Sequence, residues 1–151
     1  MSYKLNRGFT LIELLVVIAI IGILSSVVLA SLNTARGKGA DAAVKANLDQ
    51  TRTQSELFYD NVGSYSGVCA DETMKIALKA ASQAGAGNDT SSLCNNSPSA
   101  TNAAWAASSP MKSKNLVNGS SGTDYWCVDS VGNSKLETDP FPNATTYVCA
   151  P

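Results

Sequence analysis

The sequence contains no histidine and little charge of either sign. Its 151 residues include 11 Lys and Arg against 12 Asp and Glu, which amounts to 15% charged residues and a net charge of −1. Without histidine, Ser-His and Cys-His catalysis and the usual mixed Cys/His metal sites are excluded. The spacing of the carboxylates does not match a calcium-binding loop. We therefore predict no enzymatic activity, no cofactor and no metal, and the near-neutral charge predicts no nucleic-acid partner.

Cysteine is scarce, and no pair has the C-x-x-C spacing of a zinc ribbon or a thioredoxin-type site. The four cysteines are Cys69, Cys94, Cys127 and Cys149. An even number, confined to the part of the chain beyond the long apolar segment, indicates two disulfides in an oxidising compartment. Four cysteines allow three connectivities. We prefer Cys69–Cys94 and Cys127–Cys149, which close the loop region and tie the last predicted strand to a predicted hairpin.

One long apolar segment, residues 9–32, contains Glu13 as its only charged residue. A helix of this length spans about 36 Å, enough to cross a hydrocarbon core of about 30 Å. Lys4 and Arg7 precede it, and no basic residue follows before Arg36, so the amino end is expected inside. An ordinary secretory signal is cut just after its apolar run, whereas here the run continues into a second helical pattern.

Residues 33–62 continue the helix with an amphipathic pattern. The expected buried face repeats at spacings of three and four residues and consists of Val44, Leu48, Thr51, Ser55, Phe58 and Val62. The other faces are expected to be solvated and carry Asp41, Lys45, Asp49, Arg52, Glu56 and Asp60. Gly37 and Gly39 weaken the helix by about 1 kcal/mol each relative to alanine, so a bend or a melted turn is expected there.

Residues 63–151 have a different composition and predict a small globular domain. A second helix is expected over residues 71–84, capped by Asp71, followed by a loop over residues 85–102. Strands are expected over residues 103–108, on both sides of Gly132–Asn133, and over residues 144–150. The predicted fold class is α+β, with a long amino-terminal helix packed on a small antiparallel sheet.

The stretch Arg7–Leu14, which reads RGFTLIEL, resembles the amino terminus of the type IV pilin and pseudopilin family. The family signature is a short basic leader ending in Gly, then Phe, then Glu at the fifth mature position, followed by an apolar run. Gly8, Phe9 and Glu13 match it. The resemblance implies a leader over residues 1–8, cleavage by prepilin peptidase between Gly8 and Phe9, and methylation of the new amino terminus at Phe9.

The resemblance also implies why a carboxylate is kept inside the apolar segment. A charge at the bilayer centre costs about 2.5–3.5 kcal/mol on insertion scales. In this family the partner of Glu13 is expected to be the amino-terminal ammonium of the adjacent subunit, which relieves that cost on assembly and sets the register between subunits. Many members have a proline in the middle of the apolar helix, whereas this chain has Ala30.

The expected function is that of a structural subunit of a type IV pilus-like filament. Residues 9–32 would form the filament core, residues 33–62 the amphipathic continuation of the helix, and residues 63–151 a disulfide-stapled head. The implied partners are further copies of the chain, the peptidase, an assembly platform and the inner membrane, with the head outside and later on an extracellular pilus. Two alternatives remain open: a type II secretion pseudopilin with a periplasmic location, and a monomeric binding module tethered by residues 9–32.

Overall fold

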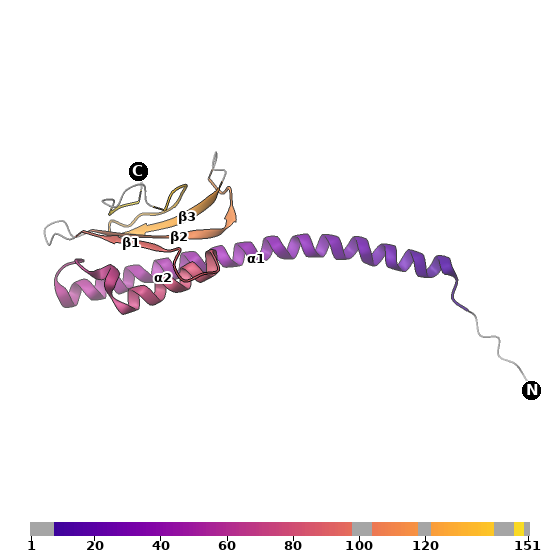
Figure 1. Cartoon of the computed structure of the whole chain (residues 1–151), viewed down its shortest axis with the longest axis horizontal. Coiled ribbons are helices and arrows are strands. Elements are labelled where there is room, and N and C mark those ends of the chain that lie inside the picture. The colour runs from indigo at the N-terminus through magenta and orange to yellow at the C-terminus, as the bar shows by residue number, and fades with distance from the viewer. Residues whose placement is uncertain (1–7, 98–103, 118–121, 141–146, 150–151) are drawn as a thin grey trace, which may run out of the picture. The chain divides into compact units, whose positions relative to one another are not determined.

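The computed structural model describes residues 8–97, 104–117, 122–140 and 147–149. The chain divides into an amino-terminal unit, Met1–Arg36, and a carboxy-terminal unit, Gly37–Pro151. The long helix α1, Leu11–Val62, contributes to both units, and the sheet belongs to the carboxy-terminal unit (Figure 1). These units differ from the ranges 9–32, 33–62 and 63–151, which stay predictions.

Helix α1 is helical in all of its 52 residues, including Gly37 and Gly39. The melted turn expected at these glycines is therefore wrong for this structure. The reason is that a glycine costs a helix only about 1 kcal/mol, and the residues that follow Gly39 are fixed by tertiary packing. The amino-terminal unit has no comparable packing, because each of its described residues, 8–36, is exposed.

The sheet has four antiparallel strands in the order β1-β2-β3-β4. They are β1 (Leu93–Asn96), β2 (Trp105–Lys114), β3 (Thr123–Asp129) and β4 (Ser134–Glu137). The hairpin expected around Gly132–Asn133 is confirmed, with β3 paired to β4 and Gly132 at φ +98°. The predicted α+β class is confirmed as well, since the second half of α1 packs on this sheet.

Two details of the sheet differ from the prediction. Strand β1 lies inside the range 85–102 that was expected to be a loop, and β2 continues to Lys114 instead of ending at residue 108. The short segment LCNN has no alternating apolar pattern, and it forms a strand through its pairing with β2. Of the closing strand expected over residues 144–150, the described residues 147–149 are not in a strand, and the remainder lies outside the described residues.

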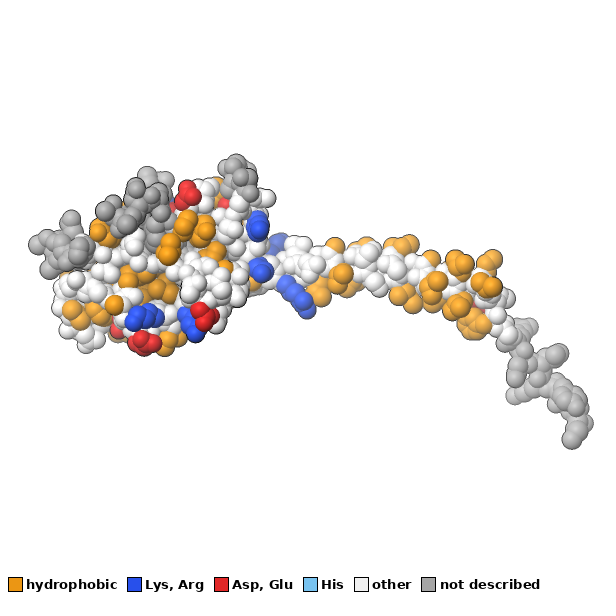
Figure 2. Space-filling model, viewed as in Figure 1, with side chains coloured by type: hydrophobic (Ala, Val, Ile, Leu, Met, Phe, Trp, Pro, Cys, Tyr) orange, Lys and Arg blue, Asp and Glu red, His pale blue; other side chains and the backbone are white. Residues whose placement is uncertain are grey.

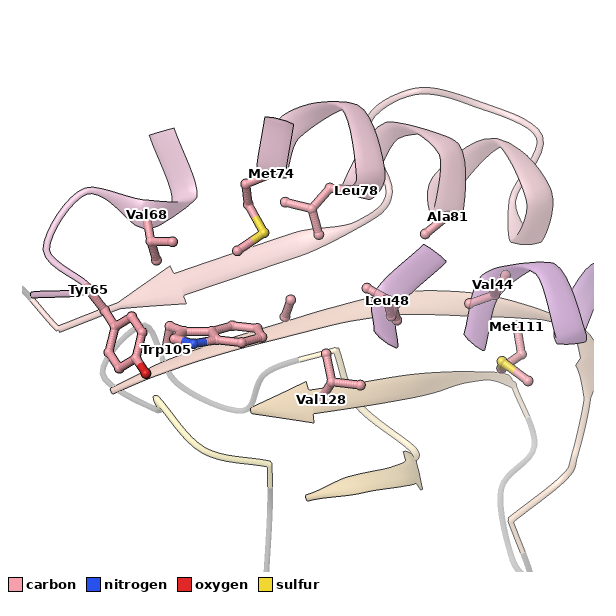
Figure 3. Packing of buried hydrophobic residues seen from close by; sticks show 11 residues of the cluster. Val44, Leu48, Tyr65, Val68, Met74, Leu78, Ala81, Trp105, Met111 and Val128 are labelled. Atoms are coloured by element: carbon pink, nitrogen blue, oxygen red, sulfur yellow. The ribbon is translucent and has the colours of Figure 1, made fainter. Parts of the chain in front are cut away.

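The hydrophobic core joins α1, the second helix and the sheet (Figure 3). Trp105 is fully buried at the start of β2, and Val44 and Leu48 of α1 are fully buried on the same cluster. Thr51 and Ser55, on the same face of α1, are buried with their hydroxyls donating to the helix carbonyls of Leu48 and Arg52. Burying two polar residues is tolerable because each hydroxyl has a partner.

The predicted face of α1 weakens toward its carboxyl end. Phe58 is half-buried, and the expectation that Val62 is buried is wrong, because its side chain is 56% exposed. Val62 is the last residue of α1. The helix extends beyond the core cluster after Phe58. The apolar repeat therefore continues to Val62, but the core does not cover the Val62 side chain.

Asp41 was expected to be solvated, and this expectation is wrong: its side chain is 8% exposed. Its Oδ1 accepts hydrogen bonds from the backbone N–H groups of Lys112, at 2.7 Å, and Ser113, at 3.1 Å. The pairing of β2 with β3 is irregular between Pro110 and Lys114, which leaves these N–H groups without regular ladder partners. Unpaired buried N–H groups are costly in free energy, and the Asp41 carboxylate on α1 supplies the acceptor that these two groups need.

The second helix, α2 (Glu72–Gly85), is confirmed with Asp71 as its N-cap. The Asp71 carboxylate accepts from the backbone N–H groups of Thr73, at 2.9 Å, and Met74, at 3.2 Å, as well as from the Thr73 hydroxyl. These bonds, with the Thr73 hydroxyl foremost, hold the pKa of Asp71 below its usual value. Met74, Leu78 and Ala81 of this helix belong to the buried core.

Two disulfides join Cys69 to Cys94 and Cys127 to Cys149, the pairing preferred from the sequence. The first encloses α2, and the second ties the end of the described chain to β3. Closing loops of 25 and 22 residues stabilises the folded chain by about 3 kcal/mol each in the chain-entropy description. For a core with few large aliphatic side chains this is a substantial contribution.

The close packing of α2 on the sheet at Gly85 allows the effect of one substitution to be predicted. A Cβ at Gly85 would lie 1.8 Å from the backbone oxygen of Pro110, and relief requires α2 or β2 to move. We expect Gly85→Ala to lower the free energy of unfolding by about 1–3 kcal/mol, measured by thermal unfolding of the detergent-solubilised chain with near-ultraviolet circular dichroism. Gly39→Ala is the matched control, because a Cβ there meets nothing within 4 Å and alanine favours the helix. Equal stability of the two variants would contradict the close packing.

Candidate assembly and processing segment

Gly8, Phe9 and Thr10 precede α1 as an exposed segment without regular secondary structure. The Phe9 side chain is 84% exposed, and a Cβ at Gly8 would meet nothing within 4 Å. The backbone between Gly8 and Phe9 is outside the helix, so its carbonyl is not engaged in the helical hydrogen-bond ladder. A peptide bond in this state is sterically open to another protein.

Thr10 and Glu13 form a capping box at the start of α1. The Glu13 Oε2 accepts from the Thr10 backbone N–H at 2.8 Å and from the Thr10 hydroxyl at 2.7 Å, while the Glu13 N–H donates to the Thr10 hydroxyl oxygen at 3.2 Å. Such reciprocal bonds satisfy donors at the helix start that have no intrahelical acceptor. This box was missed in the predictions from sequence, although the pattern Thr-x-x-Glu is its usual signal.

The geometry leaves one face of the Glu13 carboxylate open. Its Oε1 receives no hydrogen bond from any residue that the structure describes, and the residue is exposed. A negative charge in the first turn is favoured by the helix dipole. The arrangement can therefore hold the carboxylate in a fixed orientation through Oε2 and present Oε1 to a cation from outside the chain.

The helix surface around and after Glu13 is mostly apolar, and orange side chains are prominent on the face of this unit that Figure 2 shows. An 18-residue window of α1 has a mean hydropathy of 2.8 with none of it buried, so this helix is long and apolar enough to cross a membrane. The large side chains exposed there by 44–84% are Phe9, Leu11, Ile12, Leu14, Leu15, Val16, Val17, Ile18, Ile20, Ile21, Ile23, Leu24, Val27, Val28, Leu29 and Leu32. A helix with such a surface needs lipid or other apolar helices around it.

Two hydroxyl groups along this part of α1 donate to carbonyls of the helix itself. Ser26 donates to the Ile23 carbonyl at 2.8 Å, and Thr34 donates to the Ala30 carbonyl at 3.3 Å. Bonds of this kind hide a polar side chain from an apolar environment. Glu13 is the one residue of 9–32 with an ionisable side chain. Since these hydroxyls have partners within the helix, the Glu13 carboxylate is the group most in need of an external partner.

Among the residues that the structure describes, one cluster has metal-ligand atoms close together: Cys127, Glu137 and Cys149, whose ligand atoms lie within 4.8 Å of one another. Both cysteines are bonded to each other in the second disulfide. Their sulfurs therefore cannot act as thiolate ligands, and the cluster does not fit a metal.

Tyr65 is the one described side chain in the carboxy-terminal unit whose pKa is shifted far from its usual value. Burial, aided by a 2.7 Å hydrogen bond from its hydroxyl to Glu56, raises the pKa of Tyr65 to about 12. The neutral Tyr65 phenol, by donating to the Glu56 carboxylate, links the segment after α1 to the helix. It is a structural group and offers no acid or base near neutral pH.

Comparison with protein families gives a match in the amino-terminal part of the chain. A family model described as the prokaryotic N-terminal methylation motif matches residues 3–29. This range includes Gly8, Phe9, Thr10 and Glu13. The search of solved structures found no match.

Two curated relatives are similar over a longer stretch. The type IV major pilin protein PilA of Myxococcus xanthus is 38% identical over 61 residues, covering 40% of this chain and 28% of that protein. The type IV wide pilus major component PilA4 of Thermus thermophilus is 44% identical over 59 residues, covering 39% of this chain and 45% of that protein. The chain thus spans less than half the length of each of these relatives.

The capping box predicts a local effect of replacing Thr10. Thr10→Val removes the hydroxyl and keeps the side-chain shape, so we expect the amide hydrogen of Glu13 to exchange about fivefold faster, as loss of a helix cap of about 1 kcal/mol implies. The measurement is hydrogen exchange by NMR on the full chain in detergent micelles. Thr10→Ser retains the hydroxyl and should leave the rate unchanged. Equal exchange in the valine and serine variants would show that the box does not stabilise the helix start.

Proposed function

We propose that the chain is a structural subunit of a type IV pilus-like filament. Its amino-terminal methylation motif, its similarity to two major pilins and its α+β fold make it a member of the type IV pilin family. Proteins of this family are structural subunits and not enzymes. The observation that carries the proposal is the sequence of features from Gly8 to Leu32. The exposed peptide bond between Gly8 and Phe9 comes first, and the Glu13 carboxylate, held by Thr10, follows it. The exposed apolar part of α1 comes next.

Processing is the first step of the proposal. Prepilin peptidase cuts between Gly8 and Phe9, and the new amino group of Phe9 is methylated. The exposed, non-helical backbone at Gly8 supports this step, since a residue without a side chain lets a protease approach closely. Cleavage leaves Thr10 and Glu13 in place, so the capping box survives in the mature chain.

Assembly is the second step. The new ammonium of Phe9 on one subunit pairs with the Glu13 Oε1 of an adjacent subunit, while the Oε2 stays bonded to Thr10 of its own chain. An ion pair in an apolar environment is stable only when its geometry is good and its other bonds are satisfied. The local bonds of Oε2 meet the second condition and fix the direction in which the carboxylate points.

The proposed location follows from the same features. The chain is first anchored in the cytoplasmic membrane by residues 9–32 with the head outside, and then passes into an extracellular pilus through an assembly platform. In the filament, the apolar surfaces of many copies cover one another in place of lipid. The disulfides of the head fit an oxidising exterior.

A second candidate function is a pseudopilin of a type II secretion system, with a periplasmic location. Ala30, at a position where many pilins have proline, is the feature that favours it. The tethered binding module is a third candidate, and it differs from both in requiring neither cleavage at Gly8 nor the carboxylate of Glu13.

Mass spectrometry of the amino-terminal peptide tests the proposed processing and location together. We expect a peptide beginning at methylated Phe9 in filaments sheared from the cells. The same peptide found only in membranes would favour the pseudopilin, and an intact Met1–Gly8 in both fractions would leave the tethered module as the remaining candidate.

Replacing Glu13 tests the assembly step. Glu13→Ala should lower the amount of subunit in the sheared fraction at least about tenfold, as loss of a paired charge implies, while the chain remains resistant to carbonate extraction from membranes. Glu72→Ala, which removes an exposed carboxylate from α2, is the matched control and should assemble normally. Normal filaments from Glu13→Ala would refute the pairing.

A further inference from the structure

Three exposed lysines lie at one end of the carboxy-terminal unit and are called here the basal patch: Lys38, Lys112 and Lys114. The contacts of α1 with β2 bring them together. Asp41 accepts from the N–H groups of Lys112 and Ser113, and a Cβ at Gly37 would lie 3.3 Å from the Ser113 Oγ. The first turn of α1 within this unit and the last residues of β2 are therefore neighbours, and Figure 2 shows basic side chains gathered where this unit begins.

The lysines of the basal patch have no ion-pair partner among the described residues. Other lysines of this unit are engaged: Lys75 pairs with Glu72 at 3.6 Å, Lys79 pairs with Asp89 at 2.8 Å, and the Lys45 Nζ lies 4.2 Å from the centre of the Trp126 ring. The basal patch thus offers ammonium groups that nothing within this part of the chain neutralises at short range.

Two carboxylates lie near the basal patch, and both are buried. Asp41 accepts the two N–H groups of β2, and Asp124 accepts the N–H of Leu116. Backbone N–H groups at or just after the end of β2 engage both carboxylates, and both residues are shielded from solvent, so the exposed charges at this end are those of the lysines. The surface of this end is consequently positive.

The opposite end of the same unit carries acidic side chains, of which Asp60 and Glu72 are exposed and Asp71 is half-buried. Asp60 lies in the last turn of α1, and Asp71 and Glu72 lie at the start of α2, with Asp71 lining the same groove as Asn61 and Val62. At 1.5 Å per residue, Lys38 and Asp60 are about 33 Å apart along α1. This separation exceeds the Debye length of about 8 Å at physiological salt. The two ends therefore act on their surroundings independently.

We propose that the basal patch binds anionic phospholipid headgroups and seats the head on the membrane before assembly; the proposal rests on the membrane-anchored subunit of the proposed function. The apolar segment ends at Leu32, only six residues before Lys38, so chain connectivity keeps the patch near the bilayer surface. Basic residues next to a membrane segment are attracted by anionic lipid. The acidic end, repelled by the same surface, is held away from it.

A second copy of the chain is the competing occupant, and the anchoring argues against it at this stage. Copies anchored in one membrane have their basal patches at the same height, so lysines face lysines. Within one copy the acidic end lies about 33 Å along α1 from Lys38, so a neighbour anchored at the same depth carries its own acids away from its own patch. Lipid phosphate is the anion present at the level of the patch.

The test uses the full chain reconstituted in vesicles of phosphatidylcholine alone or with about one-third phosphatidylglycerol. Acetylation rates of individual lysines are read by mass spectrometry, with Lys75 and Lys79 of the same molecule as internal controls. We expect Lys112 and Lys114 to react about fivefold more slowly in anionic than in neutral vesicles, with the protection lost at 0.5 M salt because screening shortens the range of the attraction. The controls should react equally in both.

A variant separates charge recognition from simple proximity. Lys112→Gln/Lys114→Gln should remove most of the protection of Lys38, whereas Lys75→Gln/Lys79→Gln should leave it intact. Equal rates in the two kinds of vesicle would overturn the lipid proposal, and protection that occurs only in sheared filaments would assign the patch to a contact between subunits. Carbonate extraction is run in parallel, because a chain that is not retained in vesicles contradicts the anchored subunit itself, a failure distinct from that of the patch.

Discussion

The structure depends on how the second half of α1 is covered. Val44 and Leu48 are removed completely from solvent by α2 and the sheet, a contribution of about 1.5–3 kcal/mol for each side chain. Asp41, one turn earlier, fixes the end of β2 against the same helix. Where this cover begins, at Gly37, one compact unit ends and the other starts. The first half of α1 has no such cover among the described residues. This difference between the two halves separates the folding of one chain from the proposed association of many copies.

Glu13 shows how one side chain can serve both processes. Within the subunit it completes the helix start through Oε2, and in the proposed filament it accepts a neighbour's ammonium through Oε1. The two uses do not compete, because they employ different oxygens. They also reinforce each other, since a carboxylate whose rotamer is already fixed loses less entropy when it binds a partner.

The parts of the structure that follow from local periodicity could be predicted from the sequence. The helical spacing identified Val44 and Leu48, and Asp71 marked the start of α2. Burial of Asp41 could not be predicted, because its reason lies in an irregular ladder about seventy residues away along the chain. Strand β1 was missed for a related reason: LCNN has no strand pattern, and only its pairing with β2 makes it one. The Thr10–Glu13 box was a local signal and was open to prediction.

The two disulfides divide the carboxy-terminal part of the chain into enclosed and open stretches. Every bond between Cys69 and Cys94, and every bond between Cys127 and Cys149, lies within a covalent ring. A protease that cuts inside either ring leaves the two fragments attached to each other. Between Cys69 and Cys149, only the stretch from Cys94 to Cys127 lies outside both rings, and its strand β2 is largely buried inside the sheet. In the proposed filament, a subunit cut once inside either ring would keep both fragments in the polymer.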